Sequence, residues 1–255
     1  MDAVIIAAGF GSRLRDISDS KPMTPVAGIP LLELGVRQAK AAGVQRVVVV
    51  TGHEAERLEA ALPALAQRAG IVVEAARVAD WSKPNGWSVI AGADCIDGNY
   101  LLMMSDHIFS APILGGLAQQ GGADRGVTLA VDARIDDPLI DPDDATWVQR
   151  DERGFIRAIG KTILSYDAVD CGAFLCTPEL AAAIRGAIAD GQAGSLSEGM
   201  QRLADNGRAA TWDIGEAWWL DVDDPRAHAL AEAQAPRELP EVYAAALTIR
   251  PAAKV

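Results

Sequence analysis

No stretch of the chain approaches the roughly 18 consecutive apolar residues that a membrane-spanning helix requires. No basic segment precedes the first strand-like run, residues 2–8, and we therefore expect no signal peptide. These two absences predict a cytoplasmic protein with no membrane segment.

Cysteine and histidine are scarce, with three residues of each type among 255. The cysteines form no C-x-x-C pair, so reduced thiols in a cytosolic protein are the simple interpretation. The histidines have no spacing typical of a zinc site. The sequence therefore offers neither a disulfide framework nor a histidine-rich metal centre.

Basic residues are also fewer than acidic ones. The chain carries 23 Lys and Arg against 35 Asp and Glu, which gives a formal net charge of −12. This charge argues against nucleic acid and against an anionic membrane as partners, because both bind basic patches. A small anionic ligand is compatible with it, since such a ligand needs only a local cation or a helix N-terminus.

The first half of the chain alternates regularly between strand-like and helix-like segments. Strands are expected at residues 2–8, 45–51, 71–76 and 99–104, the first two of them buried, with helices at 30–42, 54–68 and 89–94. Pro63 is expected to kink or divide the second helix. This β-α-β pattern predicts a Rossmann-like, three-layer α/β fold with a mixed, mostly parallel central sheet.

The second half is more mixed. A hairpin is expected at residues 145–159, further strands at 127–133, 171–176, 209–213 and 218–222, and helices at 179–189, 196–206 and 225–233. No linker divides the chain. We therefore expect one domain, residues 1–232, followed by a C-terminal tail, residues 233–255, rich in Ala, Pro and Glu.

A glycine loop follows the first strand in the segment Ala7-Ala-Gly-Phe-Gly-Ser-Arg-Leu14. Glycine permits close approach and positive φ, so backbone amides can point at phosphate oxygens. Arg13 adds a bidentate cation, and Lys21 adds a second one before a rigid proline. The alternative is an ordinary glycine turn, because the segment matches neither a dinucleotide fingerprint nor a P-loop. The residues expected to bind the nucleotide here are Ala8, Gly9, Gly11 and Ser12.

Two acidic segments come next. Asp106 follows the fourth expected strand, at the carboxyl end where α/β sheets bind ligands. Asp221 and Asp223 alternate after a late strand and so share one face, whereas Asp224 is typical of a helix N-cap. Carboxylates from separate segments form a hard oxygen site suited to Mg²⁺, so Asp106, Asp221 and Asp223 are the expected metal ligands. A turn cap at Asp106 and a solvated acidic turn at the late segment are the alternatives.

The string Gly9-x-Gly11-x-Arg13-Leu14, followed by Lys21-Pro22 and residues 25–32, resembles the opening of the sugar-phosphate nucleotidyltransferases. The chain departs from that pattern at Ile29, where lysine is usual. Further segments occur in an order similar to that of the CTP:inositol-1-phosphate cytidylyltransferases, up to about residue 232. They are residues 51–56, 85–88, 104–107, 144–146, 159–161, 170–174 and 219–223.

The resemblance implies a nucleotidyltransferase fold and three catalytic cations. Arg13 would hold the β- and γ-phosphates, Lys21 the α-phosphate, and Lys161 the phosphate of the acceptor. Magnesium would bind Asp106 with either Asp221 or Asp223. The resemblance further implies nucleoside contacts from Asn85 and Gly86, and acceptor contacts from Asp144, Asp170 and Glu198.

The implied reaction transfers CMP from CTP to inositol 1-phosphate or a similar phosphorylated alcohol, and forms a CDP-alcohol and pyrophosphate. Similar domains are often fused to a membrane-embedded CDP-alcohol transferase, which would here be a separate downstream partner. A hexose-1-phosphate or phosphocholine nucleotidyltransferase is an alternative, and a GTP-dependent transferase acting on a molybdenum cofactor is a more distant one. Outside enzymes, the alternative is a nucleotide-sensing subunit. The sequence leaves base preference and oligomeric state open.

Overall fold

Four consecutive valines, Val47–Val50, form the centre of the sheet. In the computed structural model, which describes residues 1–14 and 17–247, they lie in β4 (Arg46–Thr51) and alternate between its two buried faces. β4 pairs in parallel with β1 (Asp2–Ile6) and β5 (Val72–Arg77), and β1 pairs in parallel with β6 (Tyr100–Met104). The parallel arrangement expected for this half is confirmed.

The second half makes the sheet mixed. β11 (Ala168–Cys176) pairs antiparallel with β6 and, on its other side, with β8 (Val127–Asp132) and β9 (Trp147–Arg150). The expected hairpin is formed by β9 and β10 (Ile156–Gly160), and β12 (Ala209–Asp213) is parallel to β8. Together these strands form one nine-stranded sheet.

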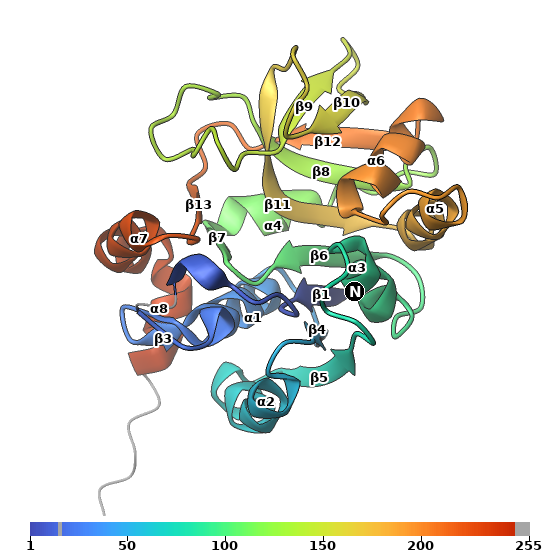
Figure 1. Cartoon of the computed structure of the whole chain (residues 1–255). Helices are drawn as coiled ribbons and strands as arrows, with labels where there is room; N and C mark the ends of the chain where they lie inside the picture. Colours follow the sequence, from blue (N-terminus) through green and yellow to red (C-terminus); the bar gives the residue numbers. More distant parts are fainter. Residues whose placement is uncertain (15–16, 248–255) are drawn as a thin grey trace, which may run out of the picture.

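Helices cover both faces of this sheet, as Figure 1 shows. The residues of each strand that point to one face pack with α1 (Leu31–Ala41), α2 (Ala55–Ala69) and α4 (Ala111–Leu117). Those that point to the other face pack with α3 (Gly86–Ala93), α5 (Pro178–Ala189) and α6 (Leu196–Asp205). The three-layer α/β fold is therefore confirmed.

A short two-stranded ribbon lies outside the main sheet. It pairs β7 (His107–Phe109) with β13 (Trp219–Asp221), and Figure 1 shows it between α7 (Pro225–Glu238) and the central sheet. Asp221 is directly opposite His107 in its register. The ribbon thus brings residues from the two halves of the chain side by side.

Packed structure continues beyond residue 232, where the C-terminal tail was expected to begin. The expected boundary at residue 232 falls inside α7, and α8 (Pro240–Leu247) follows it. Ala235, Leu239 and Val242 are buried, and Arg37 of α1 donates a hydrogen bond to the carbonyl of Val242 at 3.1 Å. Residues 233–247 therefore belong to the domain, and the rest of the expected tail, 248–255, lies outside the described residues.

The elements that were not expected from the sequence include β7, α4 and α8. Pro63 does not divide its helix, because α2 continues from Ala55 to Ala69 with the proline inside it. Among the described residues, no helix is long and apolar enough to cross a membrane. The expected cytoplasmic location stays a prediction.

Candidate functional site

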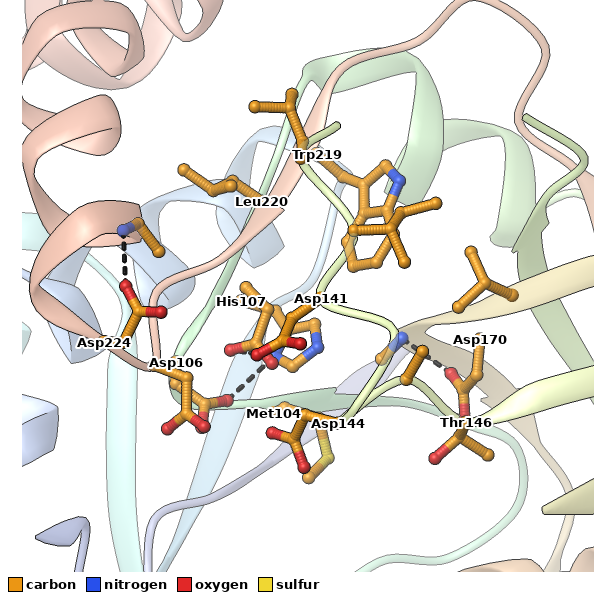
Figure 2. A pocket seen from close by; sticks show the side chains of 18 of the residues that line it. Met104, Asp106, His107, Asp141, Asp144, Thr146, Asp170, Trp219, Leu220 and Asp224 are labelled. Carbon is orange, nitrogen blue, oxygen red and sulfur yellow. Dashed lines mark hydrogen bonds and ion pairs between the residues drawn. The ribbon is translucent and has the colours of Figure 1, made fainter. Parts of the chain in front are cut away.

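A cavity of about 600 Å³ opens where β1 and β6 end, beside the β7–β13 ribbon. Its other walls are the loop at residues 138–146, the first part of β11 and the N-terminal turns of α7. Figure 2 shows acidic side chains from these separate elements pointing into the same space. The expected site residues that line it are Gly11, Arg13, Lys21, Asn85, Asp106, Asp144, Lys161, Asp170, Asp221 and Asp223.

The glycine loop brings Lys21 into this cavity. Gly11 has φ +61°, and a Cβ at this position would lie 2.5 Å from the Cβ of Lys21. Only glycine fits this close approach without displacing the lysine. At Gly9, by contrast, a Cβ would meet no atom within 4 Å. The carbonyl of Ala8 accepts a hydrogen bond from the backbone of His53, so that group is already used.

The remaining loop residue, Ser12, begins the short helix Ser12–Leu14, but its side chain lies outside what the structure describes. Neither Ala8 nor Gly9 lines the cavity, whereas Gly11 does. The phosphate-binding role expected for these residues stays a prediction, with Gly11 the best placed of them.

Lys21 is the central cation of the site. Its ammonium donates to Asp106 at 2.6 Å and also to Asp223, and only 11% of its side chain is exposed. Burial opposes its charge, but the carboxylates of Asp106, Asp221 and Asp223 outweigh this and hold the pKa of Lys21 above its ordinary value. Lys21 is therefore charged at neutral pH.

The ribbon sets the positions of Asp106, His107 and Asp221. The backbone amide of Val222 donates to the carbonyl of Asp106 at 2.9 Å, which closes the ribbon beside the two acids. His107 Nδ1 lies 2.8 Å from Asp106 Oδ1. Burial opposes protonation of His107, yet Asp221 and Asp106 raise its pKa to about 9. The ring of His107 therefore contacts Asp106 and fixes the orientation of its carboxylate.

The acids of the cavity fit a divalent cation. One group of potential ligand atoms comes from Asp106, His107 and Asp221, and a second from Asp144, Asp221 and Asp223; within each group the atoms lie within 4.8 Å of one another. The buried Oδ1 of Asp221 accepts no hydrogen bond from the described residues. Burial raises the pKa of Asp221 to about 6, and a hard cation is the group that would satisfy this oxygen.

A second set of charges adjoins these acids, because Asp144 belongs to the group that it forms with Asp221 and Asp223. Asp144 accepts a hydrogen bond from Arg13 at 2.6 Å and another from Lys161. Although burial opposes ionisation, these two cations hold the pKa of Asp144 well below its usual range. Asp144 thus links the cation expected to bind the nucleotide phosphates with the one expected to bind the acceptor.

Asp170 provides a less charged wall. One of its oxygens accepts the backbone amide of Gly172 at 2.7 Å, and burial raises the pKa of Asp170 to about 6. No cation among the described residues forms an ion pair with it. A carboxylate in this setting suits hydroxyl groups better than a phosphate.

Three other expected residues have structural partners. Asn85 lines the cavity, and its side-chain oxygen accepts the amide of Leu196 at 2.9 Å. Gly86 is a packing contact, because a Cβ there would lie 2.3 Å from the carbonyl of Gly194. Glu198 does not line the cavity, since it closes the N-terminal capping box of α6 with Ser195. The acceptor contact expected for Glu198 stays a prediction.

The sequence pointed to residues 144–146 of the loop at 138–146 but not to the rest of this wall of the site. Asp141 lies in it and faces the same space as Asp144 in Figure 2. Arg226 of α7 contacts this loop by donating a hydrogen bond to the carbonyl of Pro138 at 3.2 Å. The run of prolines and aspartates between two strands was the signal available for this loop.

The family model of the MobA-like NTP transferase domain matches residues 3–153, which include the glycine loop, Lys21, Asp106 and Asp144. The chain belongs to this family. The late acids of this NTP transferase, Asp221 and Asp223, lie beyond the matched residues.

Curated relatives extend the likeness beyond the family model. The bifunctional IPC transferase and DIPP synthase of Rubrobacter xylanophilus is 35% identical over 234 residues, which cover 90% of this chain and 51% of the relative. A protein of the same name from Aquifex aeolicus is 28% identical over 225 residues, 88% of this chain and 49% of the relative. The chain therefore spans about half the length of the curated relatives it matches.

Among solved structures, the NTP transferase chain is similar to the inositol-1-phosphate CTP transferase from T. maritima. The TM-score is 0.80 at 22% identity, and the match covers 93% of this chain and 97% of that chain. At this identity the likeness shows the fold, and the nucleotidyltransferase fold expected from the sequence is confirmed.

Proposed function

We propose that this NTP transferase moves CMP from CTP to inositol 1-phosphate, or to a similar phosphorylated alcohol, and releases pyrophosphate with the help of Mg²⁺. The observation that carries the proposal is the convergence of Arg13, Lys21 and Lys161 with the acids Asp106 and Asp221 in one cavity. The names of the curated relatives and of the T. maritima structure support the choice of substrates.

The reaction asks the protein for position and charge more than for covalent chemistry. An oxygen of the acceptor phosphate attacks the α-phosphorus of CTP in line, and pyrophosphate leaves from the opposite side. The attacking phosphate is already an anion, so no general base is needed. Lys21, which is charged and nearly buried, stabilises the α-phosphate as negative charge develops there.

The other cations divide the remaining work. Arg13 and the amides of the glycine loop hold the β- and γ-phosphates, and Lys161 holds the phosphate of the acceptor. Bound Mg²⁺ supplies further neutralisation of the triphosphate charge, and Asp106 with Asp221 are its proposed ligands. We choose Asp221 over Asp223 because Asp223 is paired with Arg13 and Lys21, whereas Asp221 has a buried oxygen without a hydrogen bond.

The acceptor end would be formed by Lys161, Asp144 and Asp170. Lys161 and Asp144 lie together at one side of the cavity, and Asp170 lies on β11 beside them. Carboxylates are good acceptors for the hydroxyl groups of a polyol. The nucleoside would lie toward Asn85, whose side-chain amide group lines the cavity while its oxygen is used by Leu196.

A second transferase activity would consume the product. The curated relatives are described as bifunctional, and this chain spans about half of their length. We propose that a membrane-embedded CDP-alcohol transferase takes the CDP-alcohol that this chain releases.

The test is pyrophosphate release with Mg²⁺, each common nucleoside triphosphate in turn, and inositol 1-phosphate, a hexose 1-phosphate or phosphocholine as acceptor. We expect release with CTP and inositol 1-phosphate, loss of that release in Asp106→Asn, and no change in the surface control Asp190→Asn. Release with another acceptor only would overturn the substrate. If the wild type releases no pyrophosphate with any pair of substrates, a nucleotide-sensing subunit is favoured.

A further inference from the structure

We propose that Asp132 and Trp219 form a positioning pair that sets the metal-binding geometry of the β7–β13 ribbon. The inference rests on the proposed Mg²⁺-dependent transfer. Neither the family match nor the names of the relatives bear on these two side chains. Asp132 lies at the end of β8, outside the lining of the main cavity.

The ribbon needs such support because it is small. Each of its strands has three residues, and they pair with each other rather than with the nine-stranded sheet. Asp106 and Asp221 lie at its open end. Two isolated short strands are marginally stable by themselves, so side-chain contacts must fix where these carboxylates lie relative to Lys21 and the rest of the site.

Trp219 makes the connecting contacts. Its ring stacks on His107, with centroids 5.9 Å apart and an interplanar angle of 16°. His107 in turn contacts Asp106, as Figure 2 shows with its ring between that carboxylate and the indole. At the far edge of the same ring, the Trp219 Nε1–H donates to Asp132 Oδ2 at 2.9 Å. The indole therefore joins Asp106, through His107, to the end of β8.

Asp132 is a rigid anchor for this contact. Its residue is 1% exposed, and Arg134 donates its backbone amide to Oδ1 at 2.8 Å and a guanidinium N–H to Oδ2 at 2.8 Å. These bonds, with that of Trp219, offset burial and hold the pKa of Asp132 below its ordinary value. Arg134 also donates to the carbonyl of Ala217 at 2.9 Å, just before β13.

Trp219 also separates two spaces. On one side is the main cavity, and on the other is a smaller cavity of about 250 Å³ that Asp132 and Arg134 line. Asp132 thus lies behind the wall of the site, and its side chain reaches that wall through the indole. A residue in such a position affects the reaction by holding His107, Asp106 and Asp221 in place, and its loss should weaken metal binding first.

The experiment compares two neighbouring tryptophans. Trp219→Phe keeps an aromatic ring beside His107 but removes the N–H that reaches Asp132. Trp218→Phe is the matched control, because its Nε1–H donates instead to Gln234 of α7 at 3.1 Å. Asp132→Asn is a second variant that keeps an acceptor oxygen and loses the charge that Arg134 requires.

Two readouts are needed. The first is the Mg²⁺ concentration that gives half of the maximal rise in Tm, measured without nucleotide. The second is the Mg²⁺ dependence of turnover, with separate kcat and KM values for CTP and the acceptor. We expect Trp219→Phe and Asp132→Asn to need roughly tenfold more Mg²⁺ in both assays, to regain much of their kcat at high Mg²⁺, and Trp218→Phe to match the wild type.

A loss of Tm and turnover in both pair variants with unchanged Mg²⁺ dependence would show a merely structural role and overturn the inference. So would an equal shift in Trp218→Phe, or a wild type whose Tm does not respond to Mg²⁺. The proposed function can fail separately. If the wild type binds Mg²⁺ but turns over no substrate pair, the proposed reaction is wrong, whereas the inference about Asp132 and Trp219 still stands on the Mg²⁺ dependence of Tm.

Discussion

Replacing Lys21 by alanine should lower kcat by about 10² to 10³ and, at the same time, tighten Mg²⁺ binding. In the structure the Lys21 ammonium donates to Asp106 at 2.6 Å and also to Asp223, two of the acids expected to bind the metal. The lysine therefore stabilises the α-phosphate in the proposed reaction, but it competes with the cation when no nucleotide is present. Its removal leaves the carboxylates free for Mg²⁺.

The size of each effect follows from burial and charge. A hydrogen bond between charged groups contributes about 1.5 to 3 kcal/mol, and Lys21 is well shielded from solvent because 11% of its side chain is exposed. Releasing one such bond for the metal corresponds to roughly tenfold tighter binding, since about 1.4 kcal/mol is a factor of ten. Loss of one charge-stabilising group from a transition state costs about 10² to 10³ in kcat.

Isothermal titration of nucleotide-free protein with Mg²⁺ measures the first effect, and pyrophosphate release measures the second. The control is Lys40→Ala, because the Lys40 ammonium donates to the carbonyl of Ala69 at 2.8 Å, away from the cavity. Without metal, Lys21→Ala should also have a lower Tm than the wild type, and Mg²⁺ should restore it. Unchanged or weaker Mg²⁺ affinity in Lys21→Ala would refute the idea that lysine and metal share these carboxylates.

Three further changes test other parts of the structure. Gly11→Ala should lower turnover by about 100-fold, because its Cβ would displace Lys21; pyrophosphate release measures this, with Gly9→Ala losing much less. Asp170→Asn should gain about 1 to 2 kcal/mol of stability relative to the wild type between pH 4 and pH 7, measured by urea unfolding. Folding raises the pKa of Asp170 to about 6, so the wild-type carboxyl destabilises the fold as it ionises over this range. Val242→Ala should cost about 2 kcal/mol in the same unfolding assay, because Val242 is buried beside Arg37.

Each of these expectations has a contrary result. Equal losses of turnover in Gly11→Ala and Gly9→Ala would show that activity depends on the flexibility of the loop in general and not on the close approach of Gly11 to Lys21. A pH-independent difference for Asp170→Asn would mean that its carboxyl is well solvated. Wild-type stability in Val242→Ala would mean that α8 contributes little to the domain.

Local patterns predicted most of the fold. The four valines and the alternation of strands and helices are strong signals, because burial on both faces of a parallel sheet leaves few polar positions. The N-cap expected at Asp224 is confirmed, since its side chain accepts the amide of Ala227 at 2.7 Å. Of the ribbon, β13 was expected as the strand at 218–222, whereas β7 was missed because three residues are too few to show a period of two.

The site was predicted in part. The acids and cations that fall in recognisable segments, such as Lys21 and Asp106, do meet in the cavity. Glu198 was assigned to the acceptor although Ser195-Leu-Ser-Glu198 already has the spacing of a capping box, and this local role is the one it has in the structure. Asp132 showed no signal, because its importance depends on an indole that is 87 residues away in the sequence.

The pairing of β7 with β13 also has a consequence for how the protein is made. Residues 107–109 cannot meet residues 219–221 until residue 221 has left the ribosome. Most of the central sheet is encoded earlier, so a nascent or truncated chain could acquire much of the fold while still being unable to capture metal. Ligand binding stabilises the native state by mass action. Bound metal would therefore stabilise only chains in which β13 has already been synthesised.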